Sequence, residues 1–283
     1  MQQTKVFMLM AALTAFVVFI GGALAGQSGA IFAFAFAIVT NVGMYWFSDR
    51  AVLKMYKAQI IGPEDAPQLF AMVDELRQKA DLPMPTVAIA ASSQPNAFAT
   101  GRNPSHAVVC FTRGILEALS PEQLAGVTAH ELAHIKHRHM LIGTIGATMA
   151  GAVGMIASMA KWGALLGGRG RDNNLFVTLA LAIVAPIGAA IIQMAISRQN
   201  EFQADRTAGE ITGNPAQLAG ALKRLEKIAK QVPMNVNPAA AQLAIVNPFA
   251  GRPGGAAGLF STHPPTEERV ARLAEQAQGV LAR

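Results

Sequence analysis

Two histidines and a glutamate near the middle of the chain have the spacing of a metal-dependent hydrolytic site. His130, Glu131 and His134 follow the pattern H-E-x-x-H. On a helix, positions i and i+4 share a face about one turn apart, so both imidazoles can bind the same metal ion. Glu131 would lie beside the first ligand, where it can accept a proton from a water molecule at the metal. We therefore predict a catalytic zinc site with Glu131 as the base.

The residues before this motif predict the helix that it needs. Ser120 suits the N-cap, Pro121 suits the first helical position, and Gln123 completes a capping box. We expect the helix to run through His134 towards the hydrophobic segment that follows. These start signals disfavour the alternative, in which the helix simply carries surface histidines.

A catalytic zinc site needs a third protein ligand and an open position for water. Met140 stands where an extended form of the motif would have a further histidine. His137 and His139 lie outside the i, i+4 register, so we interpret them, together with Lys136 and Arg138, as a cationic cluster that flanks the membrane. A ligand role for either histidine is the alternative.

Glu201 is the third ligand that the spacing favours. It follows a hydrophobic hairpin that begins seven residues after His134 and ends five residues before Glu201. Since an α-helix rises about 1.5 Å per residue, the two residues should lie about 10 and 8 Å above the membrane. Asp205 lies four residues further on, on the same helix face, where it can accept a hydrogen bond from a ligand imidazole. A solvated helix face is the alternative for both carboxylates.

Hydrophobic segments account for the composition of the chain. Apolar residues make up 52%, charged residues make up 14%, and the mean hydropathy is +0.33, whereas globular chains carry about 25% charged residues. Four uncharged segments are long enough to cross about 30 Å of hydrocarbon; they are residues 6–25, 30–47, 141–160 and 175–196. We predict two transmembrane hairpins, the first with a turn at 26–29. The alternatives are four buried helices of a soluble core and, for the first segment, a secretory signal.

Positive charge lies mostly on one side of these predicted spans. Of the 23 lysines and arginines, 20 lie on the side of both termini, and three lie in or beside the opposite loop: Lys161, Arg169 and Arg171. This asymmetry predicts that both termini and both polar segments are cytoplasmic. The net charge of +6 is not accompanied by the aromatic and basic cluster of a nucleic-acid-binding protein. The single Cys110 suits a reducing compartment.

The two polar segments would form one catalytic domain that the second hairpin interrupts. The predicted division is a transmembrane hairpin at 1–48, a first catalytic half at 49–140, a second hairpin at 141–196 and a second catalytic half at 197–283. Hydrophobic periodicity and turn residues predict further elements. They are a helix at 63–80, strands at 86–91, 96–100 and 106–111, and helices at 198–211, 216–231 and 264–278. Residues 232–260 are expected to be a loop, and its role stays open.

The combination of motifs resembles the HtpX group of bacterial membrane zinc proteases, relatives of the eukaryotic CAAX prenyl-protein endopeptidases. The resemblance covers nearly the whole chain. Four motifs carry it, in the same order: N-A-F-A-T at 96–100, H-E-L-A-H at 130–134, E-F-Q-A-D at 201–205 and S-T-H-P-P at 261–265. It implies a mostly α membrane protein with four transmembrane helices, a gluzincin-like α+β catalytic domain with a small β-sheet, and one zinc ion per chain.

The resemblance also implies roles for residues outside the predicted zinc site. Asn96, Ala97 and Phe98 would lie in an edge strand that binds the substrate backbone by β-augmentation. His263 would stabilise the oxyanion, with helix capping or a purely structural role as its alternative. The implied activity is endopeptidase cleavage of misfolded or damaged membrane proteins on the cytoplasmic side of the bacterial inner membrane, in quality control and stress response. The individual polypeptide substrates, a homo-oligomer and quality-control partners are left open.

Two other functional classes stay open at this point. An intramembrane metalloprotease would have its H-E-x-x-H motif inside a span, whereas here the motif lies among Gln123, Lys136 and Arg138. A non-enzymatic membrane scaffold with a vestigial metal site would have no need of Glu131, because a structural metal site requires ligands but no base.

Overall fold

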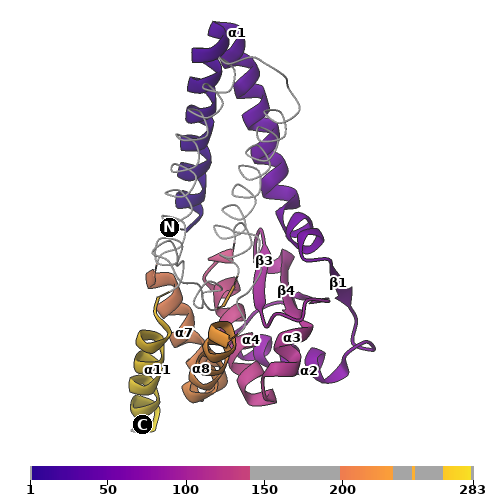
Figure 1. The fold of residues 1–283 in the computed structure, drawn as a ribbon, viewed down its shortest axis with the longest axis vertical. Coiled ribbons are helices and arrows are strands. Elements are labelled where there is room, and N and C mark those ends of the chain that lie inside the picture. The colour runs from indigo at the N-terminus through magenta and orange to yellow at the C-terminus, as the bar shows by residue number, and fades with distance from the viewer. Residues whose placement is uncertain (1, 141–197, 232–243, 246–263, 282–283) are drawn as a thin grey trace.

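The structure is a computed structural model of the chain, and it describes residues 2–140, 198–231, 244–245 and 264–281 (Figure 1). A long helical hairpin stands above a smaller unit that combines a four-stranded sheet with several helices. The predicted second hairpin, most of the predicted loop at 232–260 and His263 lie outside the described residues.

The first helix, α1 (Gln2–Met55), folds back on itself, so that its two arms run side by side (Figure 1). The chain reverses near Gly26, whose φ of +60° is a conformation that glycine adopts without steric cost. The side chain of Asn41 in one arm donates a 2.8 Å hydrogen bond to the hydroxyl of Thr14 in the other. The reversal lies at the turn that the sequence predicts at 26–29.

The outer surface of α1 is apolar. Its segment Gly26–Phe47 is long and apolar enough to cross a membrane, and it is the one such helix found in the described part of the chain. Large side chains on both arms are exposed, among them Phe19 at 74% and Phe32 at 75%. A surface of this kind is unfavourable in water and suits lipid. Of the four predicted spans, the described residues support one by length and composition.

The sheet has the strand order β1-β2-β4-β3. Its central strands, β2 (Thr86–Ala90) and β4 (Ala107–Thr112), pair in parallel. The edge strands, β1 (Ala58–Ile61) and β3 (Ala97–Gly101), pair antiparallel with β2 and β4 respectively. The three predicted strands are therefore present, and β3 lies at an edge. The sequence prediction lacks β1, because four residues are too few to show an alternating pattern.

The helices of the smaller unit begin and end close to their sequence signals. α2 (Pro67–Lys79) corresponds to the helix predicted at 63–80 and buries Leu69, Val73 and Leu76, with Phe70 half-buried. α4 (Pro121–Lys136) begins with the predicted capping box, in which the side chains of Ser120 and Gln123 each accept a hydrogen bond from the other's backbone N–H. The remaining elements are η1 (Pro104–His106), α3 (Arg113–Ala118), α7 (Arg198–Thr212), α8 (Pro215–Gln231) and α11 (Thr266–Leu281).

The end of α4 differs from the prediction. The sequence predicts a helix that continues towards the second hairpin, but α4 stops at Lys136, and Arg138 adopts a left-handed conformation with a φ of +58°. The N–H of His139 donates a 2.9 Å hydrogen bond to the carbonyl of His134, so the chain turns back towards the helix. The continuous helix that we used to estimate the height of Glu201 is therefore wrong.

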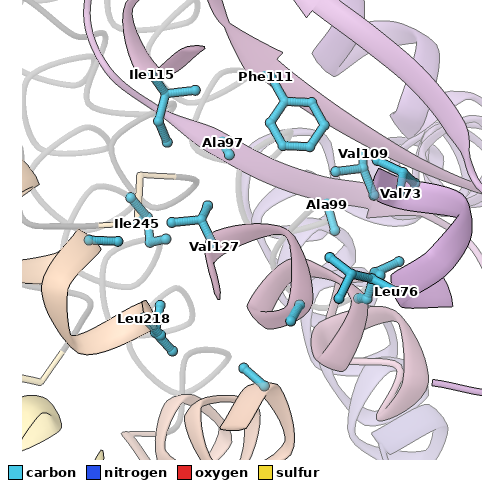
Figure 2. Close-up of a cluster of buried hydrophobic side chains, with 14 of the residues drawn as sticks. Val73, Leu76, Ala97, Ala99, Val109, Phe111, Ile115, Val127, Leu218 and Ile245 are labelled. Carbon is cyan, nitrogen blue, oxygen red and sulfur yellow. The ribbon is translucent and has the colours of Figure 1, made fainter. Parts of the chain in front are cut away.

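A hydrophobic core fills the space between the sheet and the helices (Figure 2). Side chains alternate along β4, because successive residues of a strand point to opposite faces. Val109 and Phe111 belong to the core that includes α4, whereas Val108 and Cys110 pack with the end of α1. α4 also contacts the edge strand β3. The core thus fixes the H-E-x-x-H helix beside the edge of the sheet.

Candidate active site and metal centre

Two imidazoles on α4 meet at one point. The Nε2 atoms of His130 and His134 lie 3.0 Å apart, one helical turn from each other in the chain. His130 is 1% exposed and His134 is half-buried. Leu132, between them in sequence, is fully buried in the core and anchors the helix there. The spacing in the sequence therefore gives the shared metal-binding point that it predicts.

α7 packs against α4 and brings Glu201 to the same point. Its Oε2 lies 3.7 Å from Nε2 of His130, and its Oε1 lies 3.4 Å from Nε2 of His134. One ligand atom from each of the three side chains lies within 4.8 Å of the others. Two imidazoles and one carboxylate form a donor set that is typical of catalytic zinc sites.

Asp205 and Arg269 fix the far side of the His130 ring. Oδ1 of Asp205 lies 3.0 Å from Nδ1 of His130, so the other ring nitrogen faces the point shared with His134 and Glu201. Arg269 donates hydrogen bonds of 2.8 and 2.7 Å to the two oxygens of Asp205. Burial would raise the pKa of Asp205, but the charge and hydrogen bonds of Arg269 outweigh it and lower that pKa to about 2. Asp205 is therefore ionised and orients the imidazole.

The charges in this site fit a divalent cation. Glu131, Glu201 and Asp205 are each at most 5% exposed, and Arg269 is the buried cation among their described partners. With all three acids ionised, the single positive charge of Arg269 would leave the site with a net charge of −2. Buried net charge is strongly unfavourable. A zinc ion between the two imidazoles and Glu201 would balance it.

Glu131 is placed to act on a proton. Burial and the nearby charge of Glu201 raise the pKa of Glu131 to about 8, although a hydrogen bond from the backbone of Ala99 and the charge of Arg269 act in the opposite direction. A carboxyl group of this kind takes up and releases a proton near neutral pH. Since Ala99 belongs to β3, the base lies against the edge strand.

The profile of Peptidase family M48 matches residues 63–277, which include α4, α7 and most of α11. The chain belongs to peptidase family M48. Members of this metallopeptidase family are zinc-dependent, and the enzyme class predicted from the sequence is confirmed.

Curated relatives of this M48 chain are named as proteases. It is 52% identical over 276 residues to a "Protease HtpX homolog" of Desulfatibacillum aliphaticivorans, with coverage of 96% of this chain and 88% of the relative. Homologues of the same name from Gemmatimonas aurantiaca and Ralstonia pickettii are 54% and 52% identical, over 96% and 97% of this chain and 98% and 96% of the relatives. The resemblance to the HtpX group is confirmed. The chain is a membrane-associated metalloprotease that acts on polypeptides.

The fold of this M48 chain is similar to that of a solved structure. The crystal structure of S. mikatae Ste24p matches with a TM-score of 0.53 at 16% sequence identity. The match covers 93% of this chain and 62% of the Ste24p chain. At this identity the likeness concerns the fold, and it spans the hairpin as well as the catalytic unit.

The predicted substrate strand lies beside the M48 site, with its side chains buried. Ala97 joins the core around α4, whereas Phe98 points the other way, and its ring centroid lies 4.5 Å from that of Tyr56. Asn96, which immediately precedes β3, accepts a hydrogen bond at Oδ1 from the backbone of Ile245. The ring of Phe98 therefore packs on the face of the sheet away from α4.

The histidines after the motif differ from the predicted cationic cluster. His139 is 6% exposed, and burial and the neighbouring His137 lower its pKa to about 4, so its imidazole is neutral. Burial and the charge of Lys136 also lower the pKa of His137, whose Nε2 lies 2.9 Å from the hydroxyl of Thr207. The turn at Arg138 causes this outcome, because it folds both rings back against α4 and α7. Neither histidine therefore adds to the positive charge of the predicted cluster with Lys136 and Arg138, and the position of that cluster at the membrane stays a prediction.

Two residues remain to be placed. His263 lies outside the described residues, and its proposed role stays a prediction. Arg269 is a site residue that sequence reasoning missed. One signal points to it: Arg269 stands four residues before the buried Leu273, so it lies on the apolar face of an amphipathic helix, where a charge needs a partner.

Proposed function

We propose that this M48 chain is a zinc-dependent endopeptidase of the bacterial inner membrane that cleaves misfolded or damaged membrane proteins on the cytoplasmic side, in quality control under stress. The observation that carries the proposal is the convergence of His130, His134 and Glu201 with Glu131 beside them. A scaffold with a structural metal has no use for a buried glutamate at that position.

His130, His134 and Glu201 would hold one zinc ion, which when bound supplies Lewis acidity towards the peptide carbonyl and the attacking water. Glu131 takes the proton of that water and delivers it to the leaving amine, and a pKa of about 8 suits both steps. Asp205 holds the His130 ring in place throughout. On the basis of the S-T-H-P-P motif, we assign to His263 the stabilisation of the oxyanion that develops during the reaction.

Peptide substrates would lie along β3. Because β3 is an edge strand, a peptide could pair with it by β-augmentation. Main-chain hydrogen bonds would then supply affinity that does not depend on the substrate sequence. The backbone N–H and C=O of Asn96 are both bonded to Thr112, so Asn96 would contribute its side-chain amide, and Ala97, the next residue of the edge, would contribute its backbone. Because the carboxylate of Glu131 accepts a hydrogen bond from the backbone of Ala99, a peptide bound along this edge would lie close to the catalytic base.

The membrane assignment rests on α1 and on the charge pattern. α1 presents exposed phenylalanines over a segment long enough to span. The second predicted hairpin, 141–196, would add two spans. The excess of lysine and arginine on the side of both termini supports a cytoplasmic active site.

Metal removal tests the proposed activity. Purified protein should contain about one zinc ion and cleave casein, chelation should abolish cleavage, and added zinc should restore it. Cleavage that survives thorough chelation would exclude zinc catalysis. Cleavage of a membrane-spanning peptide within its apolar stretch, with casein left intact, would favour an intramembrane protease instead.

A further inference from the structure

Side chains, and not a helix or strand, hold Ile245 in the core. Its backbone N–H donates a 3.1 Å hydrogen bond to Oδ1 of Asn96, and its carbonyl accepts a 3.0 Å hydrogen bond from Nη1 of Arg269. Ile245 is 2% exposed, and its neighbour Ala244 is 3% exposed. Side chains distant in sequence thus recognise both backbone groups of one residue, as they would those of a bound peptide.

The groups that hold Ile245 belong to the active site. Nη1 of Arg269 also lies 3.8 Å from Oε2 of Glu201, and Nη2 lies 3.5 Å from Nε2 of His130. One guanidinium group therefore lies between the Ile245 carbonyl and two of the proposed zinc ligands. On the other side, Asn96 immediately precedes the edge strand proposed to bind substrate.

The side chain of Ile245 fills an apolar pocket. Figure 2 shows it in the cluster with Ala97 of β3, Val127 of α4 and Leu218 of α8. Val127 lies three residues before His130, so the elements that carry the catalytic groups also build this pocket. A branched aliphatic side chain fits such a lining, whereas a charged one would lose its hydration there.

We propose that this pocket is the subsite for the substrate residue beside the cut peptide bond, that it prefers a branched aliphatic residue, and that Ile245 occupies it as an internal competitor. The inference rests on the proposed peptidase function. A substrate residue in this place would form hydrogen bonds with the side chains of Asn96 and Arg269 through its backbone. These bonds would contribute affinity for any peptide, and the pocket would select the side chain. Ile245 must leave the pocket before a substrate residue can bind there, because the buried pocket holds only one residue.

The preference is measurable on the wild-type protein. The substrates are quenched-fluorescence peptides that differ only at the residues next to the cut bond. We expect peptides with Ile, Leu or Val at one of these positions to be cut at least about tenfold faster, as kcat/KM, than those with Gly or Asp. Equal kcat/KM across this series would overturn the inference.

Ile245→Ala tests the competition, because it keeps the backbone and shortens the side chain. The kcat/KM for the aliphatic peptides should rise at least about fivefold, through a lower KM, since more of the enzyme is free to bind. Leu225→Ala is the matched control, an equally buried aliphatic residue of the same core on α8. It should lower the thermal midpoint without raising kcat/KM. If Ile245→Ala behaves in the same way, Ile245 is an ordinary core residue.

A binding measurement needs no turnover. The probe is a fluorescent peptide of residues 242–248, Gln-Leu-Ala-Ile-Val-Asn-Pro, and Glu131→Gln prevents its cleavage. It should bind the Glu131→Gln, Ile245→Ala double variant at least about tenfold more tightly than Glu131→Gln alone, by fluorescence anisotropy. Equal affinities, or no binding to the double variant, contradict the internal competitor.

These outcomes separate the two proposals. If the wild-type protein cleaves nothing, or cleaves after zinc removal, the peptidase function fails, and the anisotropy result still decides whether the pocket binds the peptide. If cleavage depends on zinc but shows no aliphatic preference, the function stands and the pocket assignment falls.

Discussion

Arg269 is the residue on which the charges of the active site depend. It is 1% exposed, donates two hydrogen bonds to Asp205, and lies 3.8 Å from Glu201. Through Asp205 it acts on the orientation of His130. A lysine in its place would have the charge but not the planar fork that bonds both carboxylate oxygens.

Arg269→Met should therefore be strongly destabilising. Removing one partner of a buried ion pair costs about 3–5 kcal/mol, because the other charge is left buried without compensation. Arg272→Met, on the same helix, is the control, since Arg272 pairs with Glu268 on the exposed surface. The thermal midpoint in detergent should fall markedly for the first variant and little for the second. Equal midpoints for the two variants would contradict the role of Arg269.

Zinc affinity tests the assignment of Glu201. Glu201→Gln replaces an anionic oxygen ligand with a neutral amide, so zinc affinity should fall sharply, with activity following. Asp205→Asn should be milder, about 10- to 100-fold, because it acts through His130. Glu210→Gln is the control on the same helix, because Glu210 pairs with Arg206 at the surface. Competition against a chelator measures the zinc affinities of the three variants. If Glu201→Gln binds zinc as tightly as the wild type, the third ligand is a residue other than Glu201.

The sequence reveals the site residues that depend on local spacing. His130, Glu131 and His134 lie within one helical turn, so their pattern alone predicts their meeting. Glu201 is predicted from an assumed helical hairpin and from the E-F-Q-A-D motif, and the structure places it at the histidines although α4 ends at Lys136. Arg269 reaches the site by tertiary packing of α11, which no local pattern encodes.

At the scale of elements, the close approach of α4 and α8 positions the catalytic helix. A Cβ on Gly126 would lie 2.5 Å from the backbone nitrogen of Leu218 and 2.8 Å from the carbonyl carbon of Gln217. Only glycine lets the two helices meet at this distance. Gly126 lies one turn before His130, so any displacement of α8 there is transmitted to the metal site.

Gly126→Ala should push α8 away from α4. Overpacking of this kind costs about 1–3 kcal/mol, so the thermal midpoint and the activity should both fall. Gly279→Ala in α11 is the control, because a Cβ there meets nothing within 4 Å. Alanine is the better helix former by up to about 1 kcal/mol, so that variant should be neutral or more stable. A stabilising Gly126→Ala would refute the close contact.

Periodicity and capping residues predict most elements of the catalytic unit, and backbone conformation explains the misses. Two helix boundaries are marked by residues of the expected type: glycine at position 213, immediately after the end of α7, and serine at position 120, the N-cap of α4. The turn after α4 has none, since its left-handed residue is Arg138 and not a glycine or asparagine. β1 is a strand because it pairs with β2, and its four residues are too few to predict that pairing from the sequence.

At the scale of the whole molecule, two surfaces of opposite character lie at opposite ends (Figure 1). The arms of α1 expose large apolar side chains, whereas the α+β unit buries its apolar residues around the active site. The arrangement suits a protein whose hairpin lies in lipid and whose catalytic unit lies at the membrane surface.

Reporter fusions test this orientation. Fusions after Arg50 and after Arg198 should report a cytoplasmic location, and fusions within residues 167–174 should report the opposite side, because most lysines and arginines lie on the same side of the predicted spans as the two termini. A fusion at Gln231 reports on the second catalytic half directly. A periplasmic signal there would overturn the cytoplasmic placement of the active site.

The central claim is that Glu131 is the base beside a zinc ion held by His130, His134 and Glu201, and one paired measurement on Glu131→Gln tests it most directly. Zinc content and casein cleavage are determined on the same preparation as the wild type. We expect the variant to keep about one zinc ion per chain and to lose turnover by at least about 10²-fold, because the substitution removes the proton acceptor and leaves the ligands. Wild-type turnover, or loss of the metal together with activity, would contradict the account.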